Sequence, residues 1–240
     1  NFSFLFINKI MKTLILCLDG RAGIECLNYL LFHNYHEYNE VMIFTHKKNN
    51  DSLIEFATSL KLKVFTTSIN NCYDEIKGKS GLLLSIHYRN IIKNNILKEF
   101  QGIKINLHPS LLPDYKGCFS SVWAIINGEK ETGITYHILT EDIDAGNILI
   151  QEKIKINQDD TAYSIFHKLI TLGIQLLPRL FMLLENNYTG TPQYLTGHER
   201  YYKRQLPYDG LIDPDWEEDK KERFVRAMYF PPYEGAVLKK

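Results

Sequence analysis

The sequence predicts an α/β fold: a Rossmann-like, mainly parallel twisted sheet with helices on both faces, plus a small C-terminal extension. An apolar run at 13–18 ends in the glycine turn at 19–23, and apolar residues at helical spacing follow it. Short apolar runs then alternate with helical patterns up to residue 100. This order is typical of a parallel sheet with crossover helices. A chain of 240 residues has room for one such domain and little more.

The individual elements follow from the same patterns. We expect strands at 13–18, 41–45, 63–66 and 81–85, with helices at 24–32, 53–60 and 91–100. In the next strand, Ile103, Ile105 and Leu107 alternate with polar residues, which predicts a half-buried strand. A loop at 109–117, a helix at 121–127 and two strands at 134–139 and 148–156 come next.

The second half closes with a long apolar helix at 162–185. Thr161 can cap this helix, and Pro178 predicts a kink or a break inside it. We expect a catalytic domain over 11–190 and a dimerising extension over 191–240, with 227–237 close to the dimer interface. Residues 1–10 are apolar but lack a basic n-region and a cleavage site, so we expect them to be an addition upstream of a native start at Met11.

The composition limits the possible partners. Lys+Arg and Asp+Glu both number 28, so the basic excess that usually accompanies nucleic-acid binding is missing. The four cysteines are scattered without metal-like spacing, which favours reduced thiols in a cytoplasmic protein and predicts no metal site. No apolar run after residue 10 approaches the length of a membrane span, so no membrane contact is expected.

Three polar residues stand out as a candidate site. Asn106 and His108 lie two apart on one strand, so their side chains leave the same face just before Pro109 and a loop. In parallel sheets, ligands collect at the carboxyl ends of strands. A solvent-facing polar face explains the pair about as well. Asp144 lies in the acidic loop between two strands, where an ordinary solvated loop is the default interpretation.

The motifs around these residues narrow the interpretation. The run Asn-Leu-His-Pro-Ser-Leu-Leu-Pro at 106–113, with Tyr115 and Gly117, resembles the signature of the tetrahydrofolate-dependent formyltransferases. The segments at 133–137 (GITYH) and 144–148 (DAGNI) resemble two further motifs of that family. The resemblance implies that Asn106, His108 and Asp144 are catalytic and that N10-formyltetrahydrofolate is the formyl donor.

The chemistry of formyl transfer requires these residue types. Asn106 can donate its amide to the oxyanion, and His108 can move the proton of the attacking amine. Asp144 would orient His108 and favour its protonated form. By resemblance, we expect folate contacts from Ser85, Ile86, His87, Tyr88, Ile138 and Asp142, and acceptor contacts from Gly20, Arg21, Tyr115, Lys116 and Trp123. For Arg21 an exposed position, for Trp123 core packing, and for His137 a strand residue satisfied by a neighbour are the ordinary alternatives.

The acceptor separates the branches of this family. The turn at 19–23 is a poor match to the phosphate loop of glycinamide ribonucleotide formyltransferases, and the chain lacks the full extra domain of methionyl-tRNA formyltransferases. The segments at 85–92 and 226–236 resemble the sugar N-formyltransferases. We therefore expect a homodimer that formylates dTDP-4-amino-4,6-dideoxyglucose for lipopolysaccharide O-antigen synthesis. A non-catalytic nucleotide-binding protein and a dehydrogenase are disfavoured because the turn is not GxGxxG.

Overall fold

The computed structural model describes residues 12–33, 38–195, 197 and 199–239, so the addition expected at residues 1–10 lies outside the described residues. A seven-stranded sheet has the strand order β3-β2-β1-β4-β5-β7-β8. The chain forms two compact units: residues up to Asn106 with Ile138–Glu141, and Leu107–His137 with Asp142–Lys240. The boundary expected at residue 190 stays a prediction.

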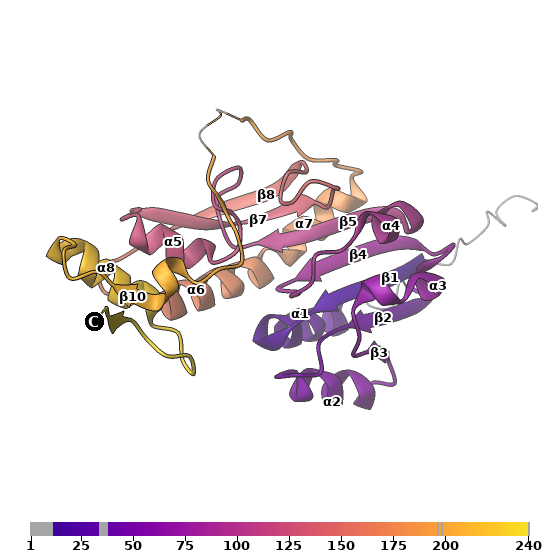
Figure 1. Ribbon diagram of the computed structural model, residues 1–240. Helices are drawn as coiled ribbons and strands as arrows, with labels where there is room; N and C mark the ends of the chain where they lie inside the picture. The colour runs from indigo at the N-terminus through magenta and orange to yellow at the C-terminus, as the bar shows by residue number, and fades with distance from the viewer. Residues whose placement is uncertain (1–11, 34–37, 196, 198, 240) are drawn as a thin grey trace, which may run out of the picture. The chain divides into compact units, whose positions relative to one another are not determined.

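The first unit carries the parallel strands (Figure 1). Its elements are β1 (Lys12–Leu18), α1 (Gly20–His33), β2 (Glu40–Phe44), α2 (Asp51–Ser59), β3 (Lys63–Phe65), η2 (Ile69–Asn71), α3 (Tyr73–Ile76), β4 (Ser80–Ile86), α4 (Asn94–Glu99) and most of β5 (Gln101–His108). Strand β1 pairs in parallel with β2 and β4, and β2 pairs in parallel with β3. The mainly parallel sheet predicted from the sequence is therefore confirmed.

Helices cover both faces of this part of the sheet. Ile15, Met42 and Phe44 form a buried cluster with residues of η2, α3 and α4. The residues between them along the strands point to the other face by alternation. There Gly23 of α1 contacts Leu18 and lies against α2. Because the sheet is buried on both faces, its strands read as continuous apolar runs rather than alternating ones.

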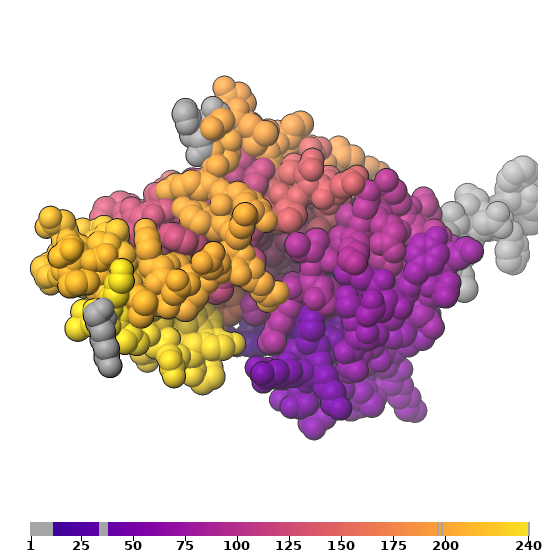
Figure 2. Space-filling model, viewed as in Figure 1, coloured from indigo at the N-terminus to yellow at the C-terminus, as the bar shows by residue number. Residues whose placement is uncertain are grey.

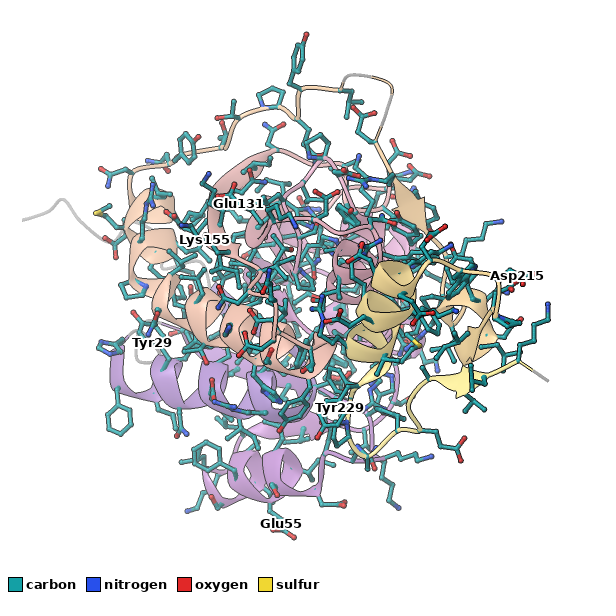
Figure 3. The ribbon with its side chains drawn as sticks, turned by 90° about the vertical axis from the view of Figure 1, so that its left-hand side faces the viewer. Tyr29, Glu55, Glu131, Lys155, Asp215 and Tyr229 are labelled. Atoms are coloured by element: carbon teal, nitrogen blue, oxygen red, sulfur yellow. The ribbon has the colours of Figure 1, made fainter. Side chains whose placement is uncertain are left out.

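The second unit holds an antiparallel hairpin and most of the remaining helices. Its elements are β6 (Lys116–Gly117), α5 (Ser120–Ile126), β7 (Glu131–Ile138), β8 (Ile148–Lys155), α6 (Ala162–Gln175), α7 (Leu177–Glu185), β9 (Tyr201–Tyr202), η3 (Pro207–Gly210), β10 (Leu211–Ile212), α8 (Glu218–Met228) and β11 (Val237–Leu238). Strand β7 pairs with β8 so that Glu131 lies opposite Lys155, and both residues are labelled in Figure 3.

The helices predicted for the two units are found, with two differences. Thr161 caps α6 by accepting a hydrogen bond from the Ser164 N–H at 3.1 Å, and the predicted break falls between α6 and α7, with Pro178 in the first turn of α7. The predicted helix at 91–100 is shorter, because α4 begins at Asn94. Helix α8 was not predicted, because it buries only Phe224, Ala227 and Met228 along a largely charged sequence.

The stretch Ala162–Glu185 is long and apolar enough to span a membrane by length and composition alone. One such stretch is weak evidence, because a core helix passes the same test. Here it is divided between α6 and α7, and the Tyr136 hydroxyl donates a 2.9 Å hydrogen bond to the Gly173 carbonyl oxygen. Leu169 and Leu180 are fully buried. Each of the two helices buries one face against the rest of the second unit.

Candidate active site

Strand β5 delivers the first two candidate residues. Ile105 and Leu107 are buried, as the alternation predicts, and Asn106 and His108 leave the opposite face. His108 is only 4% exposed, so for this residue the alternative of a solvent-facing polar face is wrong. A buried imidazole at a strand end needs polar partners.

His108 lies between two hydrogen-bond acceptors. Its Nε2 is 2.9 Å from the carbonyl oxygen of Tyr115, and its Nδ1 is 3.5 Å from Oδ2 of Asp144. A carbonyl oxygen only accepts, so the Nε2 atom carries the proton in this contact. Burial lowers the pKa of His108, while the Asp144 carboxylate acts to raise it. The ring is therefore neutral near pH 7, and Nδ1 can take up a proton while paired with a carboxylate.

Asp144 enters the site from the turn between β7 and β8. Its backbone is left-handed, with φ of 50°. Oδ2 accepts a 2.9 Å hydrogen bond from the Gly117 N–H, and Oδ1 is 3.5 Å from Nε2 of His137. Burial acts to raise the pKa of this carboxyl, but His108, His137 and the Gly117 N–H outweigh it and lower the pKa to about 2. Asp144 is thus a carboxylate at any working pH.

His137 is a member of the site that sequence reasoning treated as a strand residue satisfied by a neighbour. It is buried near the end of β7, and the neighbour is Asp144. Its ring stands edge-on to that of His108, with 6.5 Å between the centroids. The available signal was its place in the GITYH motif, near the end of a predicted strand. Among residues 12–33, 38–195, 197 and 199–239, no group of His, Cys, Asp or Glu side chains is placed to hold a metal ion.

The loop that carries Tyr115 is held by polar side chains of the hairpin. Thr135 donates from its hydroxyl to the Ser110 carbonyl oxygen at 2.7 Å. Gln151 donates from Nε2 to the Leu112 carbonyl oxygen at 2.8 Å. The Ser110 hydroxyl in turn donates to the Asp114 carbonyl oxygen at 2.8 Å. The loop that carries the Tyr115 carbonyl oxygen is therefore held in place by these three hydrogen bonds.

In the first unit, the buried Asp19 joins the loops that follow β1, β2 and β4. Its carboxylate accepts hydrogen bonds from Thr45, from the backbone and ring of His46, from Asn50 and from the Arg89 N–H, at 2.7–3.0 Å. Sequence reasoning missed this residue, because a carboxylate in a glycine turn normally faces solvent. Its effect is to fix the carboxyl edge of the sheet, where ligands collect.

Gly20 and Arg21 line a pocket of about 390 Å³ beside this edge. The Gly20 N–H donates to Oδ1 of Asn50 at 2.6 Å. The Arg21 side chain is 56% exposed and pairs with Glu25. It is exposed as the ordinary alternative expected, but it lies in the first turn of α1 and not in a loop. The acceptor contacts expected from both residues stay predictions.

The residues expected to contact folate fall mainly in the first unit. Ser85 and Ile86 are buried at the end of β4, and His87 follows in a left-handed conformation with φ of 56°. The Tyr88 hydroxyl accepts a 3.0 Å hydrogen bond from the Ile69 N–H. Ile138, at the end of β7, groups with this unit, whereas Asp142 groups with the second and is exposed.

Tyr115, Lys116 and Trp123 lie in the second unit. The Tyr115 hydroxyl donates to Glu129 at 2.7 Å and its ring stacks on that of Tyr202, so the carbonyl, not the side chain, faces His108. The Lys116 N–H donates to the Arg200 carbonyl oxygen at 3.0 Å. Trp123 stacks on Tyr202 with 4.5 Å between ring centroids and lines a pocket of about 330 Å³ with Lys203 and Tyr208. Their roles in acceptor binding stay predictions.

A buried His–Asp pair at the end of a strand in a Rossmann-like sheet is typical of enzymes that move a proton during group transfer. The Formyl transferase family model matches residues 45–181. The chain is 39% identical over 208 residues to the GDP-perosamine N-formyltransferase of Brucella melitensis, covering 85% of this chain and 80% of the relative. The chain belongs to the formyl transferase family. Within it, the chain belongs to the sugar N-formyltransferase branch.

Solved structures agree with the fold. A sugar 3-N-formyl transferase, WlaRD, solved in the presence of dTDP and 5-N-formyl-THF, superposes with a TM-score of 0.78 at 23% identity, over 95% of this chain and 82% of that one. The N-formyltransferase of Helicobacter canadensis, in complex with folinic acid and dTDP-3-aminofucose, gives a TM-score of 0.74 at 25% identity, over 96% and 84%. The family, fold class and enzyme class predicted from the sequence are confirmed.

Proposed function

We propose that this enzyme transfers the formyl group of N10-formyltetrahydrofolate to the amino group of a nucleotide-linked amino sugar. The observation that carries the proposal is the buried pair of His108 and Asp144, with Asn106 two residues away on the same face of β5. The 39% identical relative is a GDP-perosamine N-formyltransferase, and two of the similar solved structures were determined with 5-N-formyl-THF or folinic acid, which supports the same reaction class.

Each of the three residues has one task in this reaction. The acceptor amine must arrive neutral, because an ammonium has no lone pair for attack. As the new C–N bond forms, negative charge develops on the formyl oxygen, and the Asn106 amide donates a hydrogen bond to it. His108 takes the proton lost by the amine nitrogen and returns it to the nitrogen of the donor as the old C–N bond breaks. Asp144, ionised throughout, stabilises the imidazolium.

The donor is a co-substrate that supplies the formyl group. The residues expected to hold it fit a pterin: 87–90 lie beyond the end of β4, outside any helix or strand and at least partly exposed. Tyr88 is fixed by its bond from Ile69, and Arg89 is fixed through its N–H to Asp19. A loop held in this way can present backbone donors and acceptors to a heteroaromatic ring.

The acceptor side has an aromatic pocket in the second unit. Trp123, Tyr202 and Tyr208 supply the rings, and Lys203 and Gln205 supply polar groups at the same pocket. Flat rings with a few polar groups suit a nucleobase and the start of a diphosphate. The formal charge of zero fits this small ligand better than a tRNA, which requires phosphate neutralisation over a wide surface.

The finer identity of the acceptor rests on two lines of support. The sequence favours a dTDP-linked 4-amino-4,6-dideoxysugar, whereas the 39% identical relative is named for GDP-perosamine. Perosamine is itself a 4-amino-4,6-dideoxyhexose, so both agree on a 4-amino group and differ in the base. We propose the GDP-linked sugar, because the structures named with dTDP are only 23% and 25% identical. The cytoplasmic location and the role in O-antigen synthesis remain predictions.

Competition between acceptors tests the proposal. The wild-type enzyme and N10-formyltetrahydrofolate are incubated with equal amounts of GDP-perosamine, dTDP-4-amino-4,6-dideoxyglucose, dTDP-3-aminofucose, glycinamide ribonucleotide and charged methionyl-tRNA, and formylated products are read by mass spectrometry. We expect formyl-GDP-perosamine to dominate. Preference for a dTDP sugar would correct only the base. A formyl group on the tRNA or on glycinamide ribonucleotide would contradict the branch-level function, and absence of all turnover would favour a binding protein.

We also propose that the extension forms the contact of a homodimer. Figure 2 shows the extension, in orange and yellow, at the surface of the molecule, and Tyr229, labelled in Figure 3, ends α8. Tyr233 is 67% and Leu238 is 66% exposed. An apolar segment of this kind is stabilised when a second copy covers it.

Sedimentation of the full chain at micromolar concentration tests the dimer. We expect the wild type to sediment as a dimer and the double variant Tyr233→Asp/Val237→Asp to sediment as a monomer, because each carboxylate would have to be desolvated at the contact. Phe32→Asp, at an exposed position on α1, is the matched control and should remain dimeric. A monomeric wild type would remove the proposal.

A further inference from the structure

The chain between α7 and η3 includes a segment, residues 191–202, that we call the connector; residues 196 and 198 of it lie outside the described residues. The connector is drawn in orange in Figure 1 and contains only the short strand β9 and one isolated bridge, at Thr191. From the sequence we expect it to be the first part of a dimerising extension. Within the second unit, however, it contacts the loop that faces His108 and the turn that carries Asp144.

Gln193 is the first contact. Its Nε2 donates to the carbonyl oxygen of Asp144 at 2.8 Å and to that of Gly146 at 2.9 Å. Its Oε1 is buried and has no hydrogen-bond partner among the described residues. An unsatisfied buried acceptor costs free energy, so the two bonds that the Gln193 amide donates must offset that cost. They close the turn that carries Asp144.

The turn needs such a closure because of its backbone. Asp144 has a φ of 50°, a left-handed conformation that costs a non-glycine residue some free energy, although less for Asp than for most others. The Gln193 amide holds the carbonyl of the same residue whose carboxylate faces His108 and His137. A change in the position of that carbonyl moves the carboxylate as well.

Strand β9 is the second contact. The N–H groups of Lys116 and Cys118 donate to the carbonyl oxygens of Arg200 and Tyr202, at 3.0 and 2.9 Å. The N–H between them belongs to Gly117 and points to the other edge, where it donates to Asp144 at 2.9 Å. Gly117 has a φ of +87°, and a Cβ there would lie 2.2 Å from the Tyr202 carbonyl oxygen, so only glycine permits this pairing.

Arg200 is the third contact. Its guanidinium pairs with Asp114 and with Glu129, and its N–H donates to Oδ1 of Asp114 at 2.8 Å. The guanidinium carbon lies 4.1 Å from the centre of the Tyr115 ring. Tyr115 is the residue whose carbonyl oxygen faces Nε2 of His108. The connector therefore contacts both the loop whose Tyr115 carbonyl oxygen faces His108 and the turn that carries Asp144.

We infer that the connector positions Asp144 against His108, and that Gln193 is the positioning residue that fixes the Asp144 turn. This inference rests on the proposed catalytic roles of the two residues. Gln193 binds two backbone carbonyl oxygens of the turn, so we expect its loss to act on the His108–Asp144 pair and on kcat rather than on substrate binding.

The variant Gln193→Met keeps the size of the side chain and removes both donor bonds. The titrating and charged groups that face His108 are Asp144, His137 and Lys116, and of these only Asp144 raises its pKa. If the Asp144 turn loosens, the pKa of His108 falls. We expect an NMR titration of the histidine rings in the substrate-free enzyme to show a fall of about half a unit or more. The His108 signal is assigned from its loss in His108→Gln.

In steady-state kinetics we expect kcat to fall about ten- to hundredfold, with both KM values within about twofold of the wild type. Gln193→Asn keeps the amide but shortens its reach, and it serves as the second variant if Gln193→Met folds poorly. It should also lower both the His108 pKa and kcat. Tyr194→Ala is the matched control: Tyr194 is the next residue of the connector, it is 84% exposed, and its loss should leave the His108 pKa and kcat unchanged.

The outcomes separate this inference from the proposed function. An unchanged His108 pKa and unchanged kcat in folded Gln193→Met and Gln193→Asn would overturn the positioning role. A wild type that formylates no amino sugar would overturn the proposed function, while the titration of the substrate-free enzyme would still test the connector. A drop in kcat with an unchanged His108 pKa would also count against the inference, because it would point to general destabilisation.

Discussion

Alanine at position 108 lowers kcat for formyl transfer by about 10²–10⁴-fold, the range that one positioned acid–base group supplies. The reason is that His108 is the buried imidazole on β5 paired with an ionised carboxylate, and the amine proton has no comparable acceptor in this pair once the ring is removed. The KM for the donor should change little, because the residues expected to contact folate lie elsewhere. Single-turnover kinetics with saturating donor and acceptor measure the effect.

The control for this substitution is a second histidine that lies outside the site. His33 is exposed at the end of α1, and His33→Ala should keep wild-type turnover. Circular dichroism verifies that both variants are folded. Turnover within about tenfold of the wild type in folded His108→Ala would contradict the assigned role, because the remaining groups cannot replace a general base.

The local strand pattern placed Asn106 and His108 on one face, although a solvent-facing polar face explained the pair about as well until the family resemblance was added. Side chains alternate along a strand, so two polar residues two positions apart must share a face, whatever the rest of the fold does. The pairing of Asp144 with His108 could not be predicted from strand alternation. Its carboxylate meets His108 only because the β7–β8 turn brings it back, and the family resemblance supplied that link before the structure did.

The residues that the sequence missed are those whose role depends on contacts distant in the chain. Asp19 lies in a glycine turn, yet it binds residues up to Arg89. Gln193 lies in a polar segment without periodicity, and only the fold brings its amide to the carbonyl oxygen of Asp144. His137 follows an irregularity in β7, between Tyr136 and His137, so strand alternation could not place its side chain, and only the fold brings it to Asp144. Local patterns fix strands and faces, whereas polar networks require the tertiary structure.

The fold itself was more accessible to sequence reasoning, and its exceptions are instructive. The buried strands of the first unit read as continuous apolar runs, which few other structures produce. Helix α8 gave no such signal, because its outer face is charged and its buried face is narrow. The short strands β6 and β9 pair over only two residues each, and such a pairing leaves no periodicity to detect.

Asparagine at position 144 should also lower kcat by about 10²–10⁴-fold, through a different physical effect. The pKa of Asp144 is about 2, so the wild-type side chain is negative throughout the working range, and Asp144→Asn removes that charge while keeping the size. The imidazolium that forms as His108 takes the amine proton then lies in a buried site without its counter-charge. The plateau of kcat therefore falls at every pH.

The pH dependence of this variant tests the cause. The carboxylate acts to raise the pKa of His108 against the lowering effect of burial, so its removal lowers that pKa further and the deprotonated base persists to lower pH. We expect the acidic limb of the kcat profile to move to lower pH while the plateau drops, and the two shifts should appear together. Glu141→Gln removes an exposed carboxylate from the same turn and should change neither. A reduced plateau with an unmoved acidic limb would mean that Asp144 acts on the shape of the site and not on the charge of His108.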